Sequence, residues 1–455
     1  MLQRLAIAAV VSAAVLPLAG NAQDVVVFEN VNVVPMDEEH VLDAQTVIVR
    51  DGRIDSIVDA ADAADIPDGA LTIDGDGRYL VPGLAEMHAH VPPSSDARYL
   101  EEVLFLYVAN GVTAARGMLG EPGHLELRER IDRHDVLGPR LYTSGPSLSA
   151  QSVSSPEQAA SIVREQADAG YDFVKLHPGL TRAEFDAAVD AAREVGIELA
   201  GHVSEEVGVE RALEARQATI DHLDGYVQYL VPEDERDAAP AGFFGIGLAD
   251  RVDLERIPEA AKATRDAGVY VVPTQTLLEH WAAPSPTADE LAARPEMAYV
   301  AQATRRQWLQ SKRQIMQSAG YTEEKARRLI DVRRRLVAAL HEEDPSLLLL
   351  GSDAPQVFNV PGFSLHHELE SIVAAGLSPY EALRTGTVHP AEFLDAEDEF
   401  GRIAPGLAAD LVLVDGNPLE DVSAMRESAG VMVRGRWLDR EELDARLEEI
   451  AGRYR

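Results

Sequence analysis

The sequence predicts an α/β protein in which a TIM (β/α)8 barrel is joined to a small composite β-sandwich domain that both termini form. Two observations support this. In the middle of the chain, eight short apolar runs alternate with Ala-, Glu- and Arg-rich stretches of helical periodicity, which is typical of a parallel α/β barrel. Strand-and-turn segments of similar texture occur at both ends. A doubly wound open sheet is the alternative, although the first strand carries no Gly-rich dinucleotide fingerprint.

The predicted elements follow in order along the chain. Residues 23–80 contain β-branched strands, and Asp51-Gly52 between two of them is typical of a hairpin turn. Residues 400–440 return to this texture, so we expect them to pair with 23–80, and 441–455 should form a C-terminal helix. The barrel domain is expected over 81–399. Its eight runs are Leu80 to His88, Val112 to Arg116, Arg140 to Thr143, Phe173 to Leu176, Glu198 to His202, Thr219 to His222, Val269 to Pro273 and Leu347 to Gly351.

One connection is much longer than the others. Residues 274–346, between the seventh and eighth runs, contain Trp281, Trp308 and a group of Arg and Lys residues between positions 305 and 335. The favoured interpretation is a solvated helical face that pairs with acidic neighbours. The alternative is a cap over the functional end of the barrel that steers an anionic substrate, because long barrel loops often carry function.

Composition excludes several classes of function. The 455 residues carry a formal net charge of −36, and such a surface repels nucleic acid and anionic membranes. The sequence contains no cysteine, which rules out thiolate ligands, cysteine nucleophiles and disulfides. Residues 1–22, with Arg4 before an apolar stretch and Gly20-Asn21-Ala22 at its end, are typical of a signal peptide. They predict an exported protein, either periplasmic or secreted.

Polar residues close or follow five of the apolar runs. Taken singly, each has a structural explanation, such as a core histidine, a snorkelling lysine or a helix-capping aspartate. The carboxyl ends of barrel strands meet on one face, however, so these side chains should converge there. Imidazole and carboxylate groups are common metal ligands, and the sequence therefore predicts a metal site. Its six residues are His88, His90, Lys175, His202, His222 and Asp353.

The motifs that contain these residues resemble those of the amidohydrolase superfamily. Within it, the chain looks most similar to the imidazolonepropionase-related and Xaa-Pro dipeptidase-like hydrolases, which cleave C–N bonds. The resemblance implies a metal-dependent barrel and a composite β-sandwich. The principal motifs are Val81-Pro82-Gly83-Leu84-Ala85-Glu86-Met87-His88-Ala89-His90, Gly201-His202-Val203, Asp221-His222-Leu223-Asp224-Gly225 and Gly351-Ser352-Asp353-Ala354.

The resemblance also implies two divalent metal ions. His88, His90 and Asp353 would bind the more buried ion, and His202 and His222 would bind the second. Histidine and oxygen ligands suit zinc, which is the expected metal, while manganese, iron and cobalt stay open.

The remaining roles implied by the resemblance concern catalysis. Lys175 would be carboxylated on its amine and bridge the two ions. Asp353 would take a proton from the attacking water and then pass one to the leaving nitrogen.

Four further residues are candidates for contact with substrate: His177, Tyr226, His280 and His366. His177 lies two residues after Lys175, so on a strand the two side chains would share one face.

The expected activity is hydrolysis of an amide or peptide bond in a small molecule such as a dipeptide, an N-acyl amino acid or an aryl-amide conjugate. We expect no nucleic-acid partner and no stable membrane association, and a homo-oligomer is compatible with the sequence. One alternative is a mononuclear enzyme that opens cyclic amides or deaminates a heterocycle, against which Lys175 argues. An esterase or phosphotriesterase would use the same metal pair. A non-catalytic ligand-binding protein would not need a general base.

Overall fold

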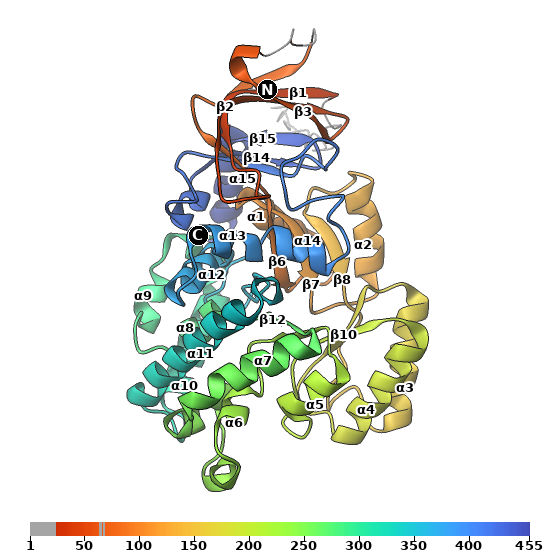
Figure 1. Cartoon of the computed structure of the whole chain (residues 1–455), viewed down its shortest axis with the longest axis vertical. Helices are drawn as coiled ribbons and strands as arrows, with labels where there is room; N and C mark the ends of the chain where they lie inside the picture. Colours follow the sequence, from red (N-terminus) through yellow and green to blue (C-terminus); the bar gives the residue numbers. More distant parts are fainter. Residues whose placement is uncertain (1–23, 63–65, 67–68) are drawn as a thin grey trace, which may run out of the picture.

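Two parallel β-sheets lie at the centre of the molecule, with helices around them (Figure 1). The computed structural model describes residues 24–62, 66 and 69–455, so the predicted signal peptide lies outside the described residues. The sheet orders are β6-β7-β8 and β9-β10-β11-β12. These strands are β6 (Leu84–Ala89), β7 (Val112–Gly117), β8 (Arg140–Thr143), β9 (Phe173–Leu176), β10 (Glu198–Gly201), β11 (Thr219–Asp221) and β12 (Tyr270–Val272). The predicted α/β fold with parallel sheets is confirmed.

Backbone hydrogen bonds connect the two sheets between β8 and β9. The Asp172 amide donates to the Thr143 carbonyl at 3.0 Å, and the His177 amide donates to the Leu148 carbonyl at 2.8 Å. All residues of β6, β7 and β9 are buried, as expected for parallel strands that are covered on both faces.

The eighth predicted strand, Leu347 to Gly351, is not a regular strand. The Leu349 amide donates to the Val271 carbonyl at 3.0 Å, and the Met87 amide donates to the Leu350 carbonyl at 2.8 Å. The segment therefore makes backbone hydrogen bonds with both β12 and β6. The Leu350 amide, however, donates to the Thr385 carbonyl at 2.8 Å, and this bond interrupts the ladder.

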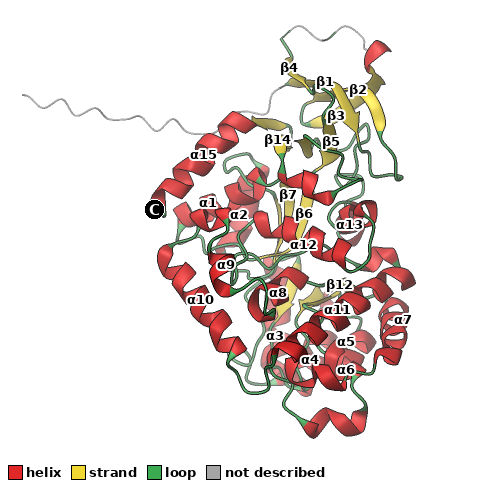
Figure 2. Ribbon diagram, turned by 90° about the vertical axis from the view of Figure 1, so that its left-hand side faces the viewer, coloured by secondary structure: helices red, strands yellow, loops and turns green. Residues whose placement is uncertain are grey.

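Most helices lie on the outside of the parallel strands (Figure 2). Local sequence signals set their ends: Thr181 and Glu184 form a capping box at the start of α4, and Gly196 ends that helix with a left-handed backbone. No helix in the described ranges is long and apolar enough to cross a membrane. The helices are α1 (Ala97–Ala109), α2 (Gly123–Asp132), α3 (Pro156–Ala169), α4 (Arg182–Val195), α5 (Gly208–Ala215), α6 (Tyr226–Leu230), α7 (Ile257–Ala267), α8 (Gln275–Ala282), α9 (Ala288–Ala292), α10 (Gln302–Met316), α11 (Glu323–Glu343), α12 (Phe363–Ala374), α13 (Pro379–Thr385), α14 (Val388–Phe393) and α15 (Arg440–Arg453).

A third, eight-stranded sheet contains strands from both ends of the chain, at the top of Figure 1. Its order is β15-β14-β13-β5-β1-β2-β3, with β4 paired to β1. In its middle, β13 pairs antiparallel with β5 so that Leu413 lies opposite Leu80. Its strands are β1 (Val25–Val33), β2 (Leu42–Arg50), β3 (Arg53–Asp59), β4 (Leu71–Asp74), β5 (Tyr79–Pro82), β13 (Leu411–Val414), β14 (Ser428–Val433) and β15 (Arg436–Asp439). That this region is a separate β-sandwich domain stays a prediction.

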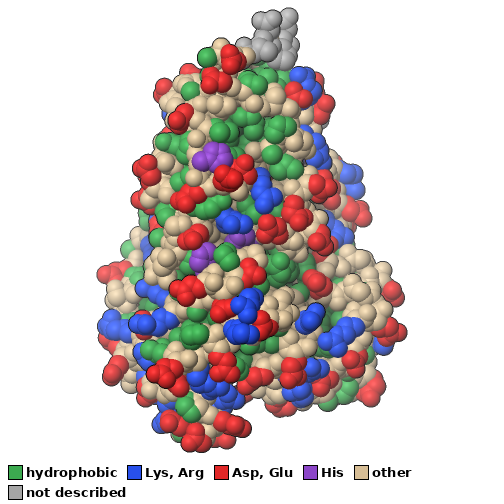
Figure 3. Space-filling model, viewed as in Figure 1, with side chains coloured by type: hydrophobic (Ala, Val, Ile, Leu, Met, Phe, Trp, Pro, Cys, Tyr) green, Lys and Arg blue, Asp and Glu red, His purple; other side chains and the backbone are tan. Residues whose placement is uncertain are grey.

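The long connection folds into α8 to α11, and its basic residues pair with acidic ones. Arg313 lies 2.9 Å from Asp289, and Arg334 lies 2.8 Å from Glu279. Figure 3 shows Lys and Arg next to Asp and Glu over the lower part of the molecule. These contacts agree with an ion-paired helical face.

The tight approach of Gly83 to β7 gives a test of this packing. A Cβ at Gly83 would lie 2.2 Å from Thr113 Oγ1, so Gly83→Ala should lower the free energy of unfolding by about 1–3 kcal/mol through overpacking. Denaturant unfolding would measure it. Gly452→Ala is the matched control, since nothing lies within 4 Å of the added methyl group. Equal free energies of unfolding in the two variants would contradict the close packing of Gly83 against Thr113.

Candidate metal centre

The structure brings the six predicted ligands together at the carboxyl ends of the central strands. Imidazole rings from separate strands lie side by side, with centroids 4.5 Å apart for His88 and His222 and 4.4 Å apart for His202 and His222. The six are His88 on β6, His90 directly after it, Lys175 on β9, His202 after β10, His222 after β11 and Asp353 after segment 347–350.

Short distances between donor atoms define the cluster. Asp353 Oδ1 lies 3.0 Å from His90 Nε2, and Lys175 Nζ lies 3.2 Å from His88 Nε2. Three ligand atoms, one each from His88, His222 and Asp353, lie within 4.8 Å of one another. Such a group can hold a metal ion.

The backbone turns sharply at two of these positions. His222 has a φ of +63° and Asp353 a φ of +61°, a region that L side chains rarely adopt and that is common at functional sites. Arg333 of α11 supports the first turn, since its Nη1 donates to the His222 carbonyl and its Nη2 to the Pro273 carbonyl.

Burial keeps the imidazoles of His88 and His222 in their neutral forms. It lowers the pKa of His88 and His222 well below the usual value, and neighbouring cationic groups lower them further. Burial also lowers the pKa of the Lys175 amine to about 8, although Asp221 and Asp353 act in the opposite direction. Neutral imidazoles are the form that binds metal.

Contacts with neighbouring side chains fix one ring nitrogen of His222 and one of His202. His222 Nδ1 lies 2.8 Å from Thr274 Oγ1, and His202 Nδ1 lies 2.7 Å from Asp224 Oδ2. Within the described residues, His222 Nε2 is buried and has no hydrogen-bond partner. Because an unpaired buried nitrogen is costly, its orientation fits a metal ligand. The residues present therefore fit a divalent metal ion.

Asp221 connects this cluster to the interior of the strands. Its Oδ2 lies 2.7 Å from His88 Nδ1 and 3.9 Å from Lys175 Nζ, and Thr219 Oγ1 donates to Oδ1 at 2.6 Å. Burial alone would raise the pKa of this carboxyl, but Arg116 and Lys175 hold it below the usual value. Asp221 is therefore an ionised partner for His88.

Arg116 is the buried counterion of Asp221. Its Nη2 lies 3.4 Å from the carboxylate, and its Nε donates to the Met87 carbonyl at 2.7 Å. The guanidinium carbon lies 5.5 Å and 5.4 Å from the ring centroids of Phe173 and Phe393, distances typical of cation–π contacts.

Glu86 connects two ligand-bearing segments. Its Oε1 accepts hydrogen bonds from the amides of His88 at 3.0 Å and Ser352 at 2.8 Å, and its Oε2 accepts from the Ser352 hydroxyl at 2.5 Å. Burial raises the pKa of this carboxyl to about 8.

Sequence reasoning did not identify these supporting residues as functional. Asp221 and Asp224 flank His222 in the motif Asp221-His222-Leu223-Asp224-Gly225, so polar residues at the end of that run were a usable signal. The contacts themselves join residues far apart in the chain, such as Asp221 and His88.

A cleft of about 870 Å³ opens beside the cluster. His202 and Asp224 line its inner end. The 3₁₀ segment η3 (Phe243–Arg251) contributes an apolar wall that includes Phe243 and Phe244.

Of the four further candidates, His177 lies against the cluster. Its ring stacks on His202 with centroids 4.9 Å apart. Burial, together with the positive charges of Lys175 and His202, lowers its pKa to about 3.

Tyr226 and His280 do not line the cleft. The Tyr226 hydroxyl lies 2.6 Å from Thr264 Oγ1, between α6 and α7. His280 Nδ1 lies 2.6 Å from Asn359 Oδ1, and its Nε2 lies 2.8 Å from Arg294 Nη1. Both side chains make contacts with neighbouring residues, and their predicted contact with substrate stays a prediction.

His366 is likewise absent from the lining of the cleft. It is buried on α12, where burial lowers its pKa to about 3 and the positive charges of Arg426 and His367 add to the shift. Its proximity to Asp353 in the sequence did not bring it to the cluster.

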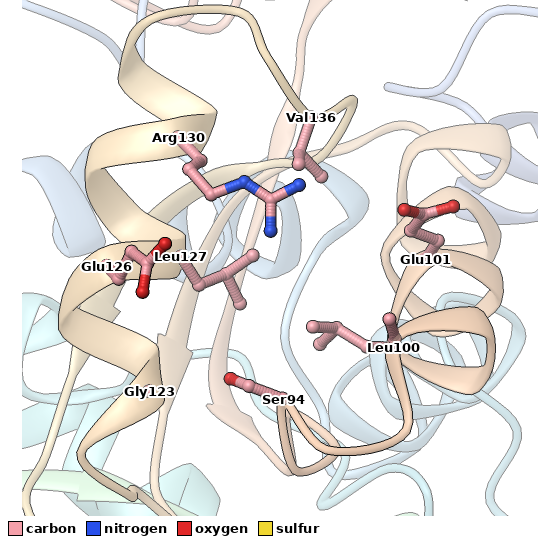
Figure 4. A pocket seen from close by; sticks show the side chains of 9 residues that line it. Ser94, Leu100, Glu101, Gly123, Glu126, Leu127, Arg130 and Val136 are labelled. Carbon is pink, nitrogen blue, oxygen red and sulfur yellow. The ribbon is translucent and has the colours of Figure 1, made fainter. Parts of the chain in front are cut away.

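A smaller cavity of about 170 Å³ lies between α1 and α2 (Figure 4). Leu100, Leu127 and Val136 supply its apolar side chains, and Glu101, Glu126 and Arg130 are charged. None of the six predicted ligands lines it.

Parallel strands that carry a buried His/His/Asp group at their carboxyl ends define the class as metal-dependent hydrolases. The sequence model of the amidohydrolase family matches residues 79–438. The chain therefore belongs to the amidohydrolase family, and it is a hydrolase of that family.

Solved structures share the fold at low sequence identity. Bottromycin amidohydrolase matches with a TM-score of 0.73 and 23% identity, covering 96% of this chain and 92% of that one. A putative prolidase from Bifidobacterium longum matches with a TM-score of 0.65 and 24% identity, covering 94% and 99%. A Xaa-Pro dipeptidase with methionine bound in its active site matches with a TM-score of 0.66 and 19% identity, covering 91% and 100%. No curated protein sequence matches the chain.

The contact between Asp221 and His88 predicts a measurable effect on metal binding. Asp221→Asn removes the charge that orients His88 and leaves Arg116 buried without a counterion. We expect metal affinity to fall about ten- to a hundredfold and the free energy of unfolding to fall by about 3 kcal/mol. Competition with a chromophoric chelator and denaturant unfolding would measure the two effects.

The matched control for this variant is Asp172→Asn. Asp172 also pairs with an arginine, Arg128 at 2.8 Å, but the pair is partly exposed. Unchanged metal affinity in Asp221→Asn would show that Asp221 does not support the metal site.

Proposed function

We propose that this protein hydrolyses a C–N bond in a small amide, such as a dipeptide, an N-acyl amino acid or an aryl-amide conjugate, at a centre of two divalent metal ions. The convergence of four imidazoles, one carboxylate and one buried amine at the strand ends supports this proposal. When bound, such ions polarise a carbonyl group and lower the pKa of water toward about 7.

The proposed ligand sets are those that the resemblance to amidohydrolases implies. His88, His90 and Asp353 would hold the more buried ion, since His88 is fully buried and His90 lies 3.0 Å from Asp353. His202 and His222, whose rings lie 4.4 Å apart, would hold the second. Zinc is the proposed metal because the donors are imidazole nitrogen and carboxylate oxygen.

Lys175 would bridge the two ions as a carboxylated lysine. An ammonium group among metal ligands would repel the cations, whereas its amine can react with carbon dioxide. The nitrogen forms a bond to carbon and loses one proton, which leaves an anionic carbamate with two oxygen donors. The position of Lys175 Nζ, buried and 3.2 Å from His88 Nε2, supports this assignment.

Asp353 is the proposed general base and acid. Its Oδ1 would take the proton of the attacking water, and the same carboxyl would deliver that proton to the leaving nitrogen. His90 Nε2 lies 3.0 Å from Oδ1, so both atoms are close enough to bind the same ion. His177, stacked on His202, is placed to contact the substrate.

The dipeptide class is supported by the names of similar structures, which include a putative prolidase and a Xaa-Pro dipeptidase. We also propose that segment 348–350 closes the parallel strands into a TIM barrel, on the hydrogen bonds it makes with β12 and β6. Export and a homo-oligomeric state stay predictions from the sequence.

Metal stoichiometry tests the role of Lys175. The wild-type protein should hold about two zinc ions per chain, whereas Lys175→Ala should hold about one and lose its activity, because the bridging ligand is gone. Bicarbonate should speed reconstitution of the metal-free wild-type protein and have no effect on the variant. Elemental analysis and the time course of activity would measure this.

The exposed Lys262, which pairs with Asp266, supplies the control variant Lys262→Ala. Full activity of Lys175→Ala with one tightly bound ion would favour the mononuclear alternative instead.

Substitution of Asp353 separates metal binding from proton transfer. Asp353→Asn keeps an oxygen donor but cannot take a proton, so we expect nearly unchanged metal content and a loss of turnover of at least about a thousandfold. The assay should include N-acyl amino acids, dipeptides and aryl esters. Persistent turnover would exclude Asp353 as the base, and hydrolysis of esters alone would exclude the amide assignment.

A further inference from the structure

The outer wall of the cleft carries two aromatic side chains that the proposed chemistry does not use. Phe243 and Phe244 are half-buried and line the cleft. They lie between Gly242 and Gly245, both with positive φ. This short sequence therefore presents two adjacent rings to the cleft on a tightly turned backbone.

Phe244 lies next to the candidate metal centre. Its ring centroid is 5.9 Å from that of His222, and the guanidinium carbon of Arg333 lies 5.8 Å from the same ring. The aromatic wall is thus continuous with the ligand cluster.

Phe243 extends the wall away from the cluster. Its ring stacks on Trp281 of α8, with centroids 4.7 Å apart and an interplanar angle of 8°, and meets Phe244 edge-on at 4.5 Å. The three rings support one another in geometries typical of stable aromatic contacts.

The backbone at Phe244 is held in an unfavourable conformation. Its φ is +48° and its ψ +28°, which is rare for a bulky side chain. Packing fixes the turn, because a Cβ at Gly245 would lie 2.7 Å from Val227 Cβ. A strained backbone of this kind persists only where the surrounding packing enforces it, and it occurs often at ligand-binding sites.

The charged residues around the cleft oppose an anionic occupant. Glu205, Glu210 and Asp237 are exposed on its lining. Among the described residues, Arg236 is the one arginine or lysine in its lining. The Arg236 guanidinium donates hydrogen bonds to the carbonyls of Val231 and Tyr229 and lies 3.4 Å from Glu210.

We propose that Phe243 and Phe244 form a substrate subsite for an aromatic or bulky apolar group that is uncharged or cationic, next to the scissile bond. This inference rests on the proposed function, because it names the substrate class that the same cleft selects. Phe244 is a specificity residue here: it contacts the substituent and takes no part in proton transfer.

Binding of a probe without a scissile bond tests the subsite independently of catalysis. Calorimetry on the zinc-loaded protein should show phenethylamine binding at least about tenfold more tightly than ethylamine, which lacks the ring. In the metal-free protein, where no ion attracts a carboxylate, phenethylamine should also bind at least about tenfold more tightly than phenylacetate, which is anionic. Phe244→Ala should weaken phenethylamine binding about tenfold and leave ethylamine unchanged. Phe244→Leu, which keeps apolar volume, should give an intermediate loss.

The matched control is Phe363→Ala, which removes a half-buried phenylalanine stacked on Tyr299, outside the lining of the cleft. It should bind phenethylamine like the wild type. Equal phenethylamine affinity in Phe244→Ala and wild type would overturn the aromatic subsite. Equal affinity of the metal-free protein for phenylacetate and phenethylamine would overturn the charge preference.

Turnover provides a second, separate measurement. Dipeptides that contain phenylalanine should be hydrolysed with a kcat/KM at least about tenfold above that of alanyl-alanine, and Phe244→Ala should remove this difference mainly through KM. Absence of turnover on every amide, with phenethylamine binding intact, would overturn the proposed function and leave the subsite standing.

Discussion

The arrangement of the candidate metal centre depends on the ion pair between Arg116 and Asp221. Both groups are fully buried, so neither is tolerable there without the other. Asp221 in turn faces His88 Nδ1 at 2.7 Å, which leaves His88 Nε2 directed toward Lys175 and Asp353. The buried charge of Asp221 thus fixes the orientation of His88, a candidate ligand at the strand ends. A substitution of Arg116 would therefore alter metal binding.

The long connection between β12 and segment 347–350 supports the candidate metal centre and its surroundings through buried cationic side chains. Arg333 of α11 donates hydrogen bonds to the carbonyls of His222 and Pro273 and lies under the ring of Phe244. Lys312 of α10 is buried and donates to the carbonyls of His280 and Ala283. These two cations satisfy backbone acceptors, so part of the basic group in this connection is structural.

Much of the framework could be predicted from the sequence. The positions of the seven regular central strands, β6 to β12, could be predicted from apolar runs in the sequence, because buried parallel strands are apolar on both faces. The candidate ligands could be picked out because each one lies near the end of such a run or follows it, as Lys175 does one residue before the end of β9. The irregular path of 347–350 could not be predicted, since it depends on the insertion of Thr385 from a distant segment. The contacts of Tyr226 and His280 could not be predicted for a related reason, because their partners, Thr264 and Asn359, become neighbours only in the folded chain.

The pairing of β5 with β13 has a consequence for how the chain folds. Leu80 lies opposite Leu413 in the middle of the terminal sheet, and β5 leads almost directly into β6, which carries His88. β5 therefore lacks one neighbour until residues 411–414 have been synthesised. Contacts of such long sequence separation form late and slow folding. The metal centre should accordingly be among the last parts of the molecule to assume its final geometry, well after the helices around it have formed.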